Sequence, residues 1–445
     1  MRVITRVVKG WSQPAFWNTD RPLITNSWGP VEKIDVDFER YVESVYKSSG
    51  IVFACIAARQ MVFSQARFLW QRFEGGRPTD LFGNQDLAIL ETPWPNGSTG
   101  DLLNMAEQDV SLAGNFYATI IDDRDGPRFR RLRPDWVTIV TGSRMWPAER
   151  ANQAPDARIL AYIYEPPASA VRSDYENVDM GEPGVYEPKD TVHYVETPDP
   201  LTNWRGMSWL TPVIREIQGD LAATEHKLKF YKNGAMPGFA IRYDKDVSPE
   251  RFKEFVDLYK KSQQGSPNAY KSLHIGGGSD VTPLTFDMSQ LDFKGVQGQG
   301  ETRIAAAAGA HPVIVGLAEG LQGSSLNAGN FGAARRLFVD GRIRSLWSKV
   351  APALQSVLTV PAGARLWYDD RDIPFLREDA KDEATIRRVN SISIRALVDT
   401  GFDPDAVIQA VTSGDLRKLT GKHSGLYSVQ LQPANSRSAQ NGGQQ

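Results

Sequence analysis

The most constraining feature of this sequence is a long, narrow apolar stripe near the middle of the chain. It recurs in steps of three, four or seven residues, and its members are Leu210, Ile214, Ile217, Leu221, Leu228 and Tyr231. This spacing predicts one helix from about Ser208 to Lys232, with Pro212 tolerated in the first turn. About 25 residues at the helical rise make a rod of roughly 37 Å. A stripe this narrow suits contact with neighbouring helices better than the centre of a globular core.

Composition excludes several classes of protein. Lys plus Arg number 51 and Asp plus Glu 53, so the formal net charge is −2 and a globally basic nucleic-acid binder is excluded. The single cysteine, Cys55, excludes an internal disulfide and a cysteine-rich zinc site. The longest strongly apolar run, Ile51 to Ala58, is too short to span a bilayer, and no targeting segment is recognised. An intracellular protein without a membrane partner is therefore the default expectation.

The part of the chain before the stripe predicts an α+β fold. Ser49 is placed to cap a helix that ends near Ser64, and Ser98 with Asp101 has capping-box spacing before another helix. Segments rich in β-branched and aromatic residues predict strands at 116–121, 137–140, 159–164 and 191–196. Residues 1–36 hold three tryptophans, so this arm packs either on its own domain or on a neighbouring subunit.

The part after the stripe alternates between small and long elements. Residues 238–286 predict a strand–helix–strand excursion whose core is thin. A second helix is predicted at 288–309, and its small residues at Ala305–Ala308 permit another helix to approach closely. A polar glycine-rich loop is predicted at 316–330. A long helix is predicted at 331–358, kinked by Pro352, and two more helices at 384–399 and 403–412. The polar tail after 433 is low in complexity.

Motif screens for catalysis and ligand binding mostly fail. Ser208 begins like a nucleophile elbow, but Leu210 stands where the second glycine is required. No two histidines have metal-ligand spacing, and His193 is expected to be structural. We therefore predict no catalytic residue, no metal site and no cofactor. Lys227, Lys229 and Lys232 cluster at the end of the stripe helix. They form either a solvated face or inter-subunit salt bridges, or else a weak phosphate-tracking surface.

Several short stretches follow one another in a distinctive order. They are SSGIVFACIAA at 48–58, LAGNFYATI at 112–120, TVHYV at 191–195 with RGMS at 205–208, FYKNGAMP at 230–237, the glycine-rich strand region at 273–284, and AAGAHPVIVGL at 307–317. In this order they resemble the portal protein, or head-to-tail connector, family of tailed double-stranded-DNA bacteriophages. FYKNGAMP is the most specific of them, and together they cover about residues 45–360.

The resemblance implies a division of the chain into named parts. Residues 1–206 are the N-terminal arm and wing, 207–236 the first stem helix, 237–287 the clip and 288–310 the second stem helix. Residues 311–330 are the tunnel-loop region, 331–383 the long kinked helix with the return to the wing, 384–430 a helical crown and 431–445 a disordered tail. The stripe residues are then a seam between stem helices of neighbouring subunits.

The resemblance also implies a function and partners. The chain would form a homo-oligomeric ring, usually a dodecamer, at one capsid vertex of a virion assembled in the host cytoplasm. Double-stranded DNA would pass through it without sequence specificity during packaging and ejection. The tunnel-loop residues expected to face that DNA are Gln322, Ser324, Ser325, Asn327 and Asn330, and they include no cation. Expected protein partners are the terminase large subunit, head-completion adaptor or tail proteins, and the major capsid protein.

Two alternatives remain open at this point. One is another ring component of a phage tail or baseplate. The other belongs to a different class and is a soluble hydrolase that uses Ser208 with His193.

Overall fold

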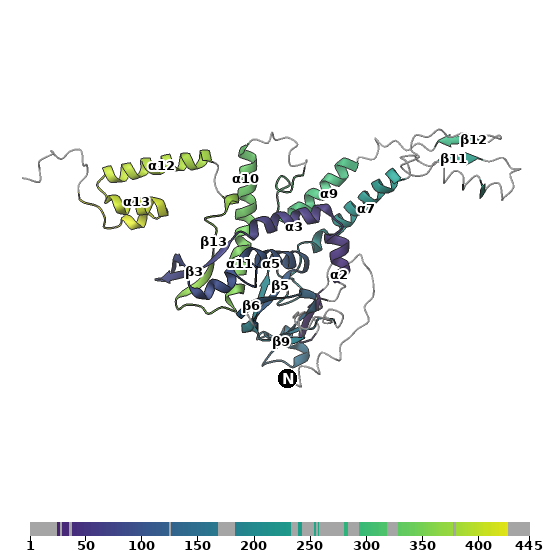
Figure 1. Cartoon of the computed structure of the whole chain (residues 1–445), viewed down its shortest axis with the longest axis horizontal. Coiled ribbons are helices and arrows are strands. Elements are labelled where there is room, and N and C mark those ends of the chain that lie inside the picture. The colour runs from purple at the N-terminus through teal and green to yellow at the C-terminus, as the bar shows by residue number, and fades with distance from the viewer. Residues whose placement is uncertain are drawn as a thin grey trace, which may run out of the picture. The chain divides into compact units, whose positions relative to one another are not determined.

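The computed structural model describes residues 25–26, 29–34, 38–123, 126–167, 183–232, 239–242, 253–254, 257, 280–283, 293–317, 328–376 and 380–425. The chain divides into two compact units, Met1–Phe375 and Leu376–Gln445. The first unit contains the sheets and the predicted stem helices, and the second is helical (Figure 1). The predicted α+β class is confirmed. Within the described ranges, no helix combines the length and the hydropathy that a bilayer crossing requires.

The largest sheet of the first unit has the strand order β1-β2-β7-β8-β9. Its strands are β1 (Thr25–Asn26), β2 (Val31–Ile34), β7 (Val137–Gly142), β8 (Arg158–Tyr164) and β9 (Gly184–Tyr186), and every pairing is antiparallel. Short 3₁₀ turns at Pro134–Trp136, Ala148–Gln153 and Pro188–Asp190 connect these strands to their neighbours. Aromatic and β-branched residues from β7 and β8 pack into one apolar cluster with Tyr117 and Leu132.

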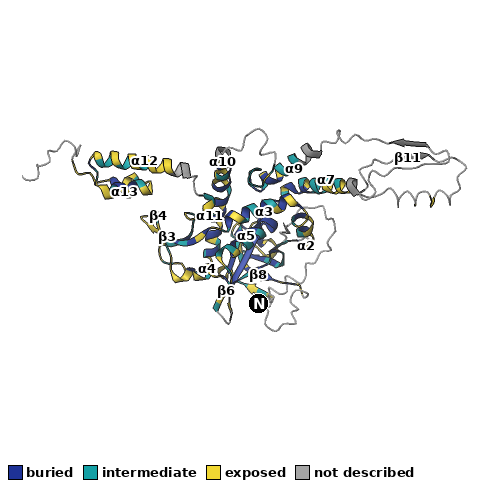
Figure 2. Ribbon diagram, turned by 45° about the horizontal axis from the view of Figure 1, so that its top comes forward, coloured by how far each residue is buried: buried dark blue, intermediate teal, exposed yellow. Residues whose placement is uncertain are grey.

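A second sheet has the order β10-β5-β6 and lies close to two buried helices. β5 (Asn115–Asp123) pairs with β6 (Gly126–Leu132) and with β10 (Thr191–Val195), whose His193 lies opposite Tyr117. The helices are α3 (Gly50–Phe63) and α5 (Thr99–Ala113), and their inward faces are buried (Figure 2). Both predicted caps are confirmed, because Ser49 accepts from the Val52 amide and Ser98 with Asp101 forms a complete capping box.

A third sheet, of order β13-β3-β4, packs against the long helical region. It consists of β3 (Arg67–Glu74), β4 (Arg77–Phe82) and β13 (Ala364–Asp369), and α11 (Arg344–Gln355) covers β13. The short helices α2 (Phe38–Tyr41) and α4 (Ala88–Glu91), a π-helical segment at Val42–Tyr46 and 3₁₀ turns at Gln85–Leu87 and Pro374–Leu376 complete this part.

The stripe helix begins later than the sequence predicts. A 3₁₀ turn at Thr211–Val213 precedes α7 (Ile214–Lys232), because the Ser208 hydroxyl accepts from the Leu210 amide and makes a separate turn before the helix. Beside α7 lies α9 (Phe293–Ala307), which corresponds to the predicted second stem helix (Figure 1). Residues 288–292 of that prediction lie outside the described residues. In the predicted clip, β11 (Phe239–Arg242) pairs antiparallel with β12 (Asp280–Pro283).

The long helix departs from α-helical geometry at a position other than Pro352. It consists of α10 (Ala328–Phe338), a π-helical segment at Val339–Ile343 and α11 (Arg344–Gln355), and Pro352 lies inside α11. The wider π turn holds one extra residue, which lets both Phe338 and Ile343 face the core, at 1% and 0% exposure. The sequence did not predict this π-helical segment, and the kink that it predicts at Pro352 stays a prediction.

The second unit is described by itself. It contains α12 (Ala380–Asp399), α13 (Pro404–Ser413) and a 3₁₀ turn at Leu416–Leu419. Asp403 caps α13 by accepting from the Ala406 amide, and Gly414 ends it in the left-handed conformation. The two predicted C-terminal helices are thus confirmed, with α12 starting a few residues earlier than expected.

Candidate functional site at the roots of α7 and α9

The two predicted stem helices are anchored where their ends meet α3, α5 and β10. Gly206 to Leu210 lead into α7, and Ala308 to Ala310 follow α9. Most of these residues are buried: Ser208 is 2% exposed, and Ala308 is fully covered. Three sets of contacts hold these roots, and each starts from a short sequence motif.

The first set is a close approach of two backbone segments. Gly114 ends α5 at a φ of 74°, and a Cβ added there would overlap the Gly206 carbonyl. A Cβ on Gly206 would in turn overlap the Gly114 carbonyl. The Asn115 side chain joins the two segments: its Nδ2 donates to the Gly206 carbonyl at 3.1 Å, and its Oδ1 accepts from the Gly206 amide at 2.9 Å. The Gly-Asn and Arg-Gly motifs are therefore two halves of one joint.

The second set continues from this joint along α5. The Ser208 hydroxyl donates to the Ser111 carbonyl at 2.5 Å, and the Trp209 indole N–H donates to the Ser111 hydroxyl at 3.0 Å. The Ser111 hydroxyl donates in turn to Glu107 Oε1 at 2.9 Å. These bonds satisfy buried polar groups and fix the direction in which the chain enters α7.

The third set is a buried charge cluster centred on Arg59. Its guanidinium is fully buried and donates to Glu107 Oε1 at 2.5 Å and to Glu196 Oε1 at 2.8 Å. Its remaining Nη donates to the Ala308 carbonyl at 2.7 Å, directly after the end of α9. A cation at a helix C-terminus satisfies free carbonyls and complements the helix dipole. Arg59 therefore ties α3, α5, the end of β10 and the root of α9 together.

The long helix joins the same cluster through Glu196. Arg342, in the π-helical segment, forms an ion pair with Glu196 Oε1, and Lys349 Nζ donates to the Glu196 carbonyl at 2.7 Å. A Cβ added to Gly309 would lie 3.0 Å from the Arg342 side chain, so a larger residue has little room there. Burial raises the pKa of Glu107, an effect that the Arg59 charge opposes, and burial lowers the pKa of Arg342. The two arginines and the two glutamates balance in charge, which makes their common burial tolerable.

His193 lies next to the joint, in an aromatic setting. Its ring stacks on Tyr117 with centroids 4.6 Å apart, its Nδ1 bonds Tyr162 at 3.1 Å and its Nε2 bonds Asn115 at 3.3 Å. Burial, and secondarily the Arg205 charge, lower the pKa of His193 to about 3, so the ring is neutral at physiological pH. The hydrolase alternative fails on this geometry, because the buried Ser208 hydroxyl donates to main chain and both His193 nitrogens have other partners.

The structure divides the predicted seam into two halves. Leu210, Ile214 and Ile217 are 0%, 7% and 0% exposed within a single chain. The prediction that these three residues face a neighbouring subunit is corrected by their burial against their own chain. Leu221 is half-buried and Leu228 is 50% exposed, so the outer half of the seam remains open to a partner.

The remaining predicted residues are described only in part. Gln322, Ser324, Ser325 and Asn327 lie outside the described residues, and Asn330 lies in the first turn of α10 without a described side chain. Lys227 is partly buried on α7, while the side chains of Lys229, Lys232 and Tyr231 lie outside the described set. The buried charge cluster was not predicted from the sequence. A signal for it existed, because Arg59 and Glu107 each lie on an otherwise apolar helix face.

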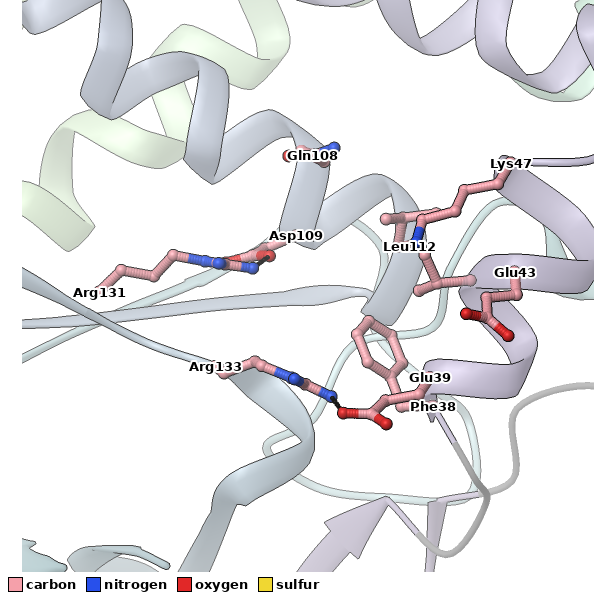
Figure 3. Close-up of a pocket in the computed structure, with 10 residues that line it drawn as sticks. Phe38, Glu39, Glu43, Lys47, Gln108, Asp109, Leu112, Arg131 and Arg133 are labelled. Atoms are coloured by element: carbon pink, nitrogen blue, oxygen red, sulfur yellow. Dashed lines mark hydrogen bonds and ion pairs between the residues drawn. The ribbon is translucent and has the colours of Figure 1, made fainter. Parts of the chain in front are cut away.

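A separate polar cleft of about 320 Å³ lies between α2, α5 and β6 (Figure 3). Arg131 forms a paired contact with Asp109 on one side, and Arg133 bonds Glu39 at 3.0 Å on the other. The first pair joins β6 to α5, and the second joins the residue after β6 to α2. Among the described residues, no group of three or more His, Cys, Asp and Glu side chains is arranged to hold a metal ion.

Comparisons with known proteins give a family model, similar solved structures and a sequence relative. The family model described as phage portal protein matches residues 51–391. A chain in the neck of a native GTA particle, computed with C12 symmetry, is 19% identical with a TM-score of 0.54, and the match covers 87% of this chain and 93% of that one. A chain in the virion of a native gene transfer agent (GTA) particle is 18% identical with a TM-score of 0.54, covering 87% and 94%. An uncharacterized protein of Rickettsia bellii (strain RML369-C) is 22% identical over 296 residues, which are 65% of this chain and 69% of that protein.

Proposed function

The chain belongs to the phage portal protein family, and on that premise we propose that it forms a dodecameric ring at one vertex of a capsid. Portal proteins are structural connectors, and the chain is not an enzyme. Double-stranded DNA passes through the ring during packaging and ejection. The family match over residues 51–391 is the observation that carries this proposal, since it spans the wing, both predicted stem helices and the long helix.

The described geometry supports a ring built from the outer half of the stem. Leu228 leaves half of its side chain exposed on α7, and Leu221 is covered only in part. A head-to-tail ring covers such residues by contact between different surfaces of successive copies. The C12 symmetry of the similar GTA neck is consistent with a twelve-membered ring.

The partners follow from the same proposal. The clip around β11 and β12 docks the terminase large subunit during packaging and a head-completion adaptor or tail protein afterwards. The wing meets the major capsid protein, and the finished ring belongs to the virion. The loop that contains Gln322, Ser324, Ser325 and Asn327 faces DNA, and its lack of Lys and Arg avoids the counterion release that makes phosphate binding strong. Lys227, Lys229 and Lys232 are the nearest candidates for a weak phosphate contact.

Electron microscopy of the purified full-length chain tests the proposal. We expect rings with a central hole and twelvefold symmetry. A second measurement adds the chain to procapsid assembly with its terminase and follows DNA that becomes resistant to nuclease. A chain that stays monomeric in both settings, or procapsids that package equally well without it, would contradict the proposal.

A further inference from the structure

A buried carboxylate lies beside the segment that leads into α7. It belongs to Glu32 of β2, which is fully covered. Three consecutive backbone N–H groups donate to it: the Asn203 amide to Oε1 at 3.0 Å, and the Trp204 and Arg205 amides to Oε2 at 3.3 Å and 3.1 Å. Consecutive N–H groups that converge in this way form an anion-binding concavity. Residues 203–205 therefore have the geometry of a carboxylate site.

Side chains complete this site. Asn152 is 3% exposed, and its Nδ2 donates to Glu32 Oε1 at 2.8 Å. The Asn203 side chain donates to the Asn152 carbonyl, which holds residues 203–205 against the 3₁₀ turn at Ala148–Gln153. Each carboxylate oxygen of Glu32 thus accepts two hydrogen bonds. Hydrogen bonds to an ionised acceptor are stronger than those between neutral groups, so the site favours a carboxylate over a neutral ligand.

The side chain of Arg205 gives a second reason for a charged ligand. Arg205 is 1% exposed, and its guanidinium donates to the main-chain carbonyls of Glu32, Pro134 and Val137. Carbonyl groups satisfy these donors but do not balance the buried positive charge. The Glu32 carboxylate accepts from the amide of the same arginine and supplies the opposite charge. A neutral ligand would leave that charge without compensation.

We propose that residues 203–205 form a carboxylate-binding site at the entry to α7, and that Glu32 is its internal ligand. β2 pairs with β7 at two positions, Val31 and Glu32, and the carboxylate adds four hydrogen bonds to this short ladder. The site lies directly before Gly206, so Glu32 is a positioning residue that joins the N-terminal strand to the start of α7. All of these contacts lie within one chain and do not depend on the proposed ring.

Replacement of the internal ligand by a free one tests the site in the full-length chain. Glu32→Ala removes a group with the heavy atoms of acetate, and we expect this variant to melt several degrees below the parent chain. Acetate at neutral pH should raise the melting temperature of the variant and leave that of the parent chain unchanged. Acetamide, which has the same shape and no charge, and sodium chloride at equal ionic strength are the control solutes.

Glu39→Ala is the matched control variant. The Glu39 side chain is 70% exposed where it pairs with Arg133, so its removal leaves no buried site, and acetate should not stabilise this variant. Equal stabilisation of Glu32→Ala and Glu39→Ala by acetate, or equal stabilisation of Glu32→Ala by acetate and by acetamide, would overturn the proposed carboxylate site.

Amide hydrogen exchange provides a local measurement. We expect the amides of residues 203–205 to exchange roughly tenfold faster in Glu32→Ala than in the parent chain, and acetate to restore the slow exchange. Glu32→Gln is the second variant if Glu32→Ala does not fold. It puts an NH₂ group in place of one oxygen, so exchange should become faster at one or two of the three amides. Unchanged exchange in the folded variants would overturn the site. Electron microscopy of the parent chain tests the proposed ring separately, and neither result determines the other.

Discussion

At the scale of single residues, Arg59 shows how one buried cation organises a junction. It lies on the inward face of α3 and makes one bond each to α5, to Glu196 and to the chain just after α9. Burial of an arginine is tolerated only when its donors are satisfied and its charge is balanced. Removing the cation takes the ion-pair partner from the buried Glu107 and leaves Glu196 with Arg342 alone.

We therefore expect Arg59→Met to lower the free energy of unfolding by about 3–5 kcal/mol. Arg395→Met is the matched control, because the Arg395–Asp399 pair is exposed and its loss should change stability by at most about 0.5 kcal/mol. Thermal and chemical denaturation of both variants provide the comparison. Adding Glu107→Gln to Arg59→Met should recover part of the loss; equal stability losses in the two arginine variants would contradict this account.

His193 makes the folding stability of the chain depend on pH, and the sign of this dependence follows from its pKa. Its pKa is near 6.5 when exposed and about 3 in the folded chain, so between these values only the unfolded chain binds the proton. Its contribution to stability is complete above pH 6.5 and is lost as the pH falls toward 3. Between pH 7 and pH 5 the loss in the free energy of unfolding from this one group is about 2 kcal/mol.

His193→Gln keeps polar groups near Tyr162 and Asn115 but removes the titration. We expect the melting temperature of this variant to fall less than that of the parent chain between pH 7 and pH 5. Unfolding scans of the two proteins at matched ionic strength measure the difference. Parallel losses in both proteins would show that His193 is not the group responsible.

At the scale of elements, the entry into α7 depends on backbone contact as much as on side chains. Gly114 and Gly206 face each other so closely that neither has room for a Cβ, and Asn115 bonds across the contact. This joint fixes the end of α5 against the residues that lead into the stripe helix. The position of the stripe helix therefore depends on the position of α5.

A pair of glycine substitutions separates this joint from general helix effects. Gly206→Ala should destabilise the chain by about 2–4 kcal/mol, because the backbone must move to admit the methyl group. Gly219→Ala, inside α7 with no atom within 4 Å of the new Cβ, should instead stabilise it by about 0.5–1 kcal/mol. Differential scanning calorimetry resolves both signs, and destabilisation by Gly219→Ala would mean that α7 itself tolerates no change.

At the scale of the whole molecule, the proposed conduit has to hold DNA without binding it tightly. Each phosphate that a cation neutralises adds affinity through counterion release. The loop around Ser324 and Ser325 has no Lys or Arg and fits that requirement, and so does the net charge of −2. Adding cations to the loop should therefore slow DNA passage.

We expect Ser324→Arg/Ser325→Arg to lower the packaging rate several-fold at low salt, with recovery as the salt concentration rises. Ser324→Asn/Ser325→Asn is the neutral control of increased size and should package near the parent rate. Packaging kinetics at two or more salt concentrations provide the test. A loss that salt does not relieve would point to a steric effect instead of an electrostatic one.

Much of the secondary structure of this protein follows from the sequence alone, because it depends on local interactions. The caps at Ser49 and Ser98, the left-handed stop at Gly114 and the order of strands and helices depend on residues that are near each other in the chain. The same holds for the periodicity that defines α7, although its first turn differs, because Ser208 bonds Ser111, a residue that only folding brings close.

Only the tertiary structure decided which side of each element is covered and by what. Equal spacing along the stripe does not reveal that Ile217 is buried and Leu228 half exposed, because burial depends on how far α9 extends beside α7. The Arg59 cluster likewise joins residues 48, 137 and 249 positions apart in sequence. The periodicity of a sequence indicates that one face of a helix is apolar. Burial and ion pairing depend on which distant segments of the chain pack on that face.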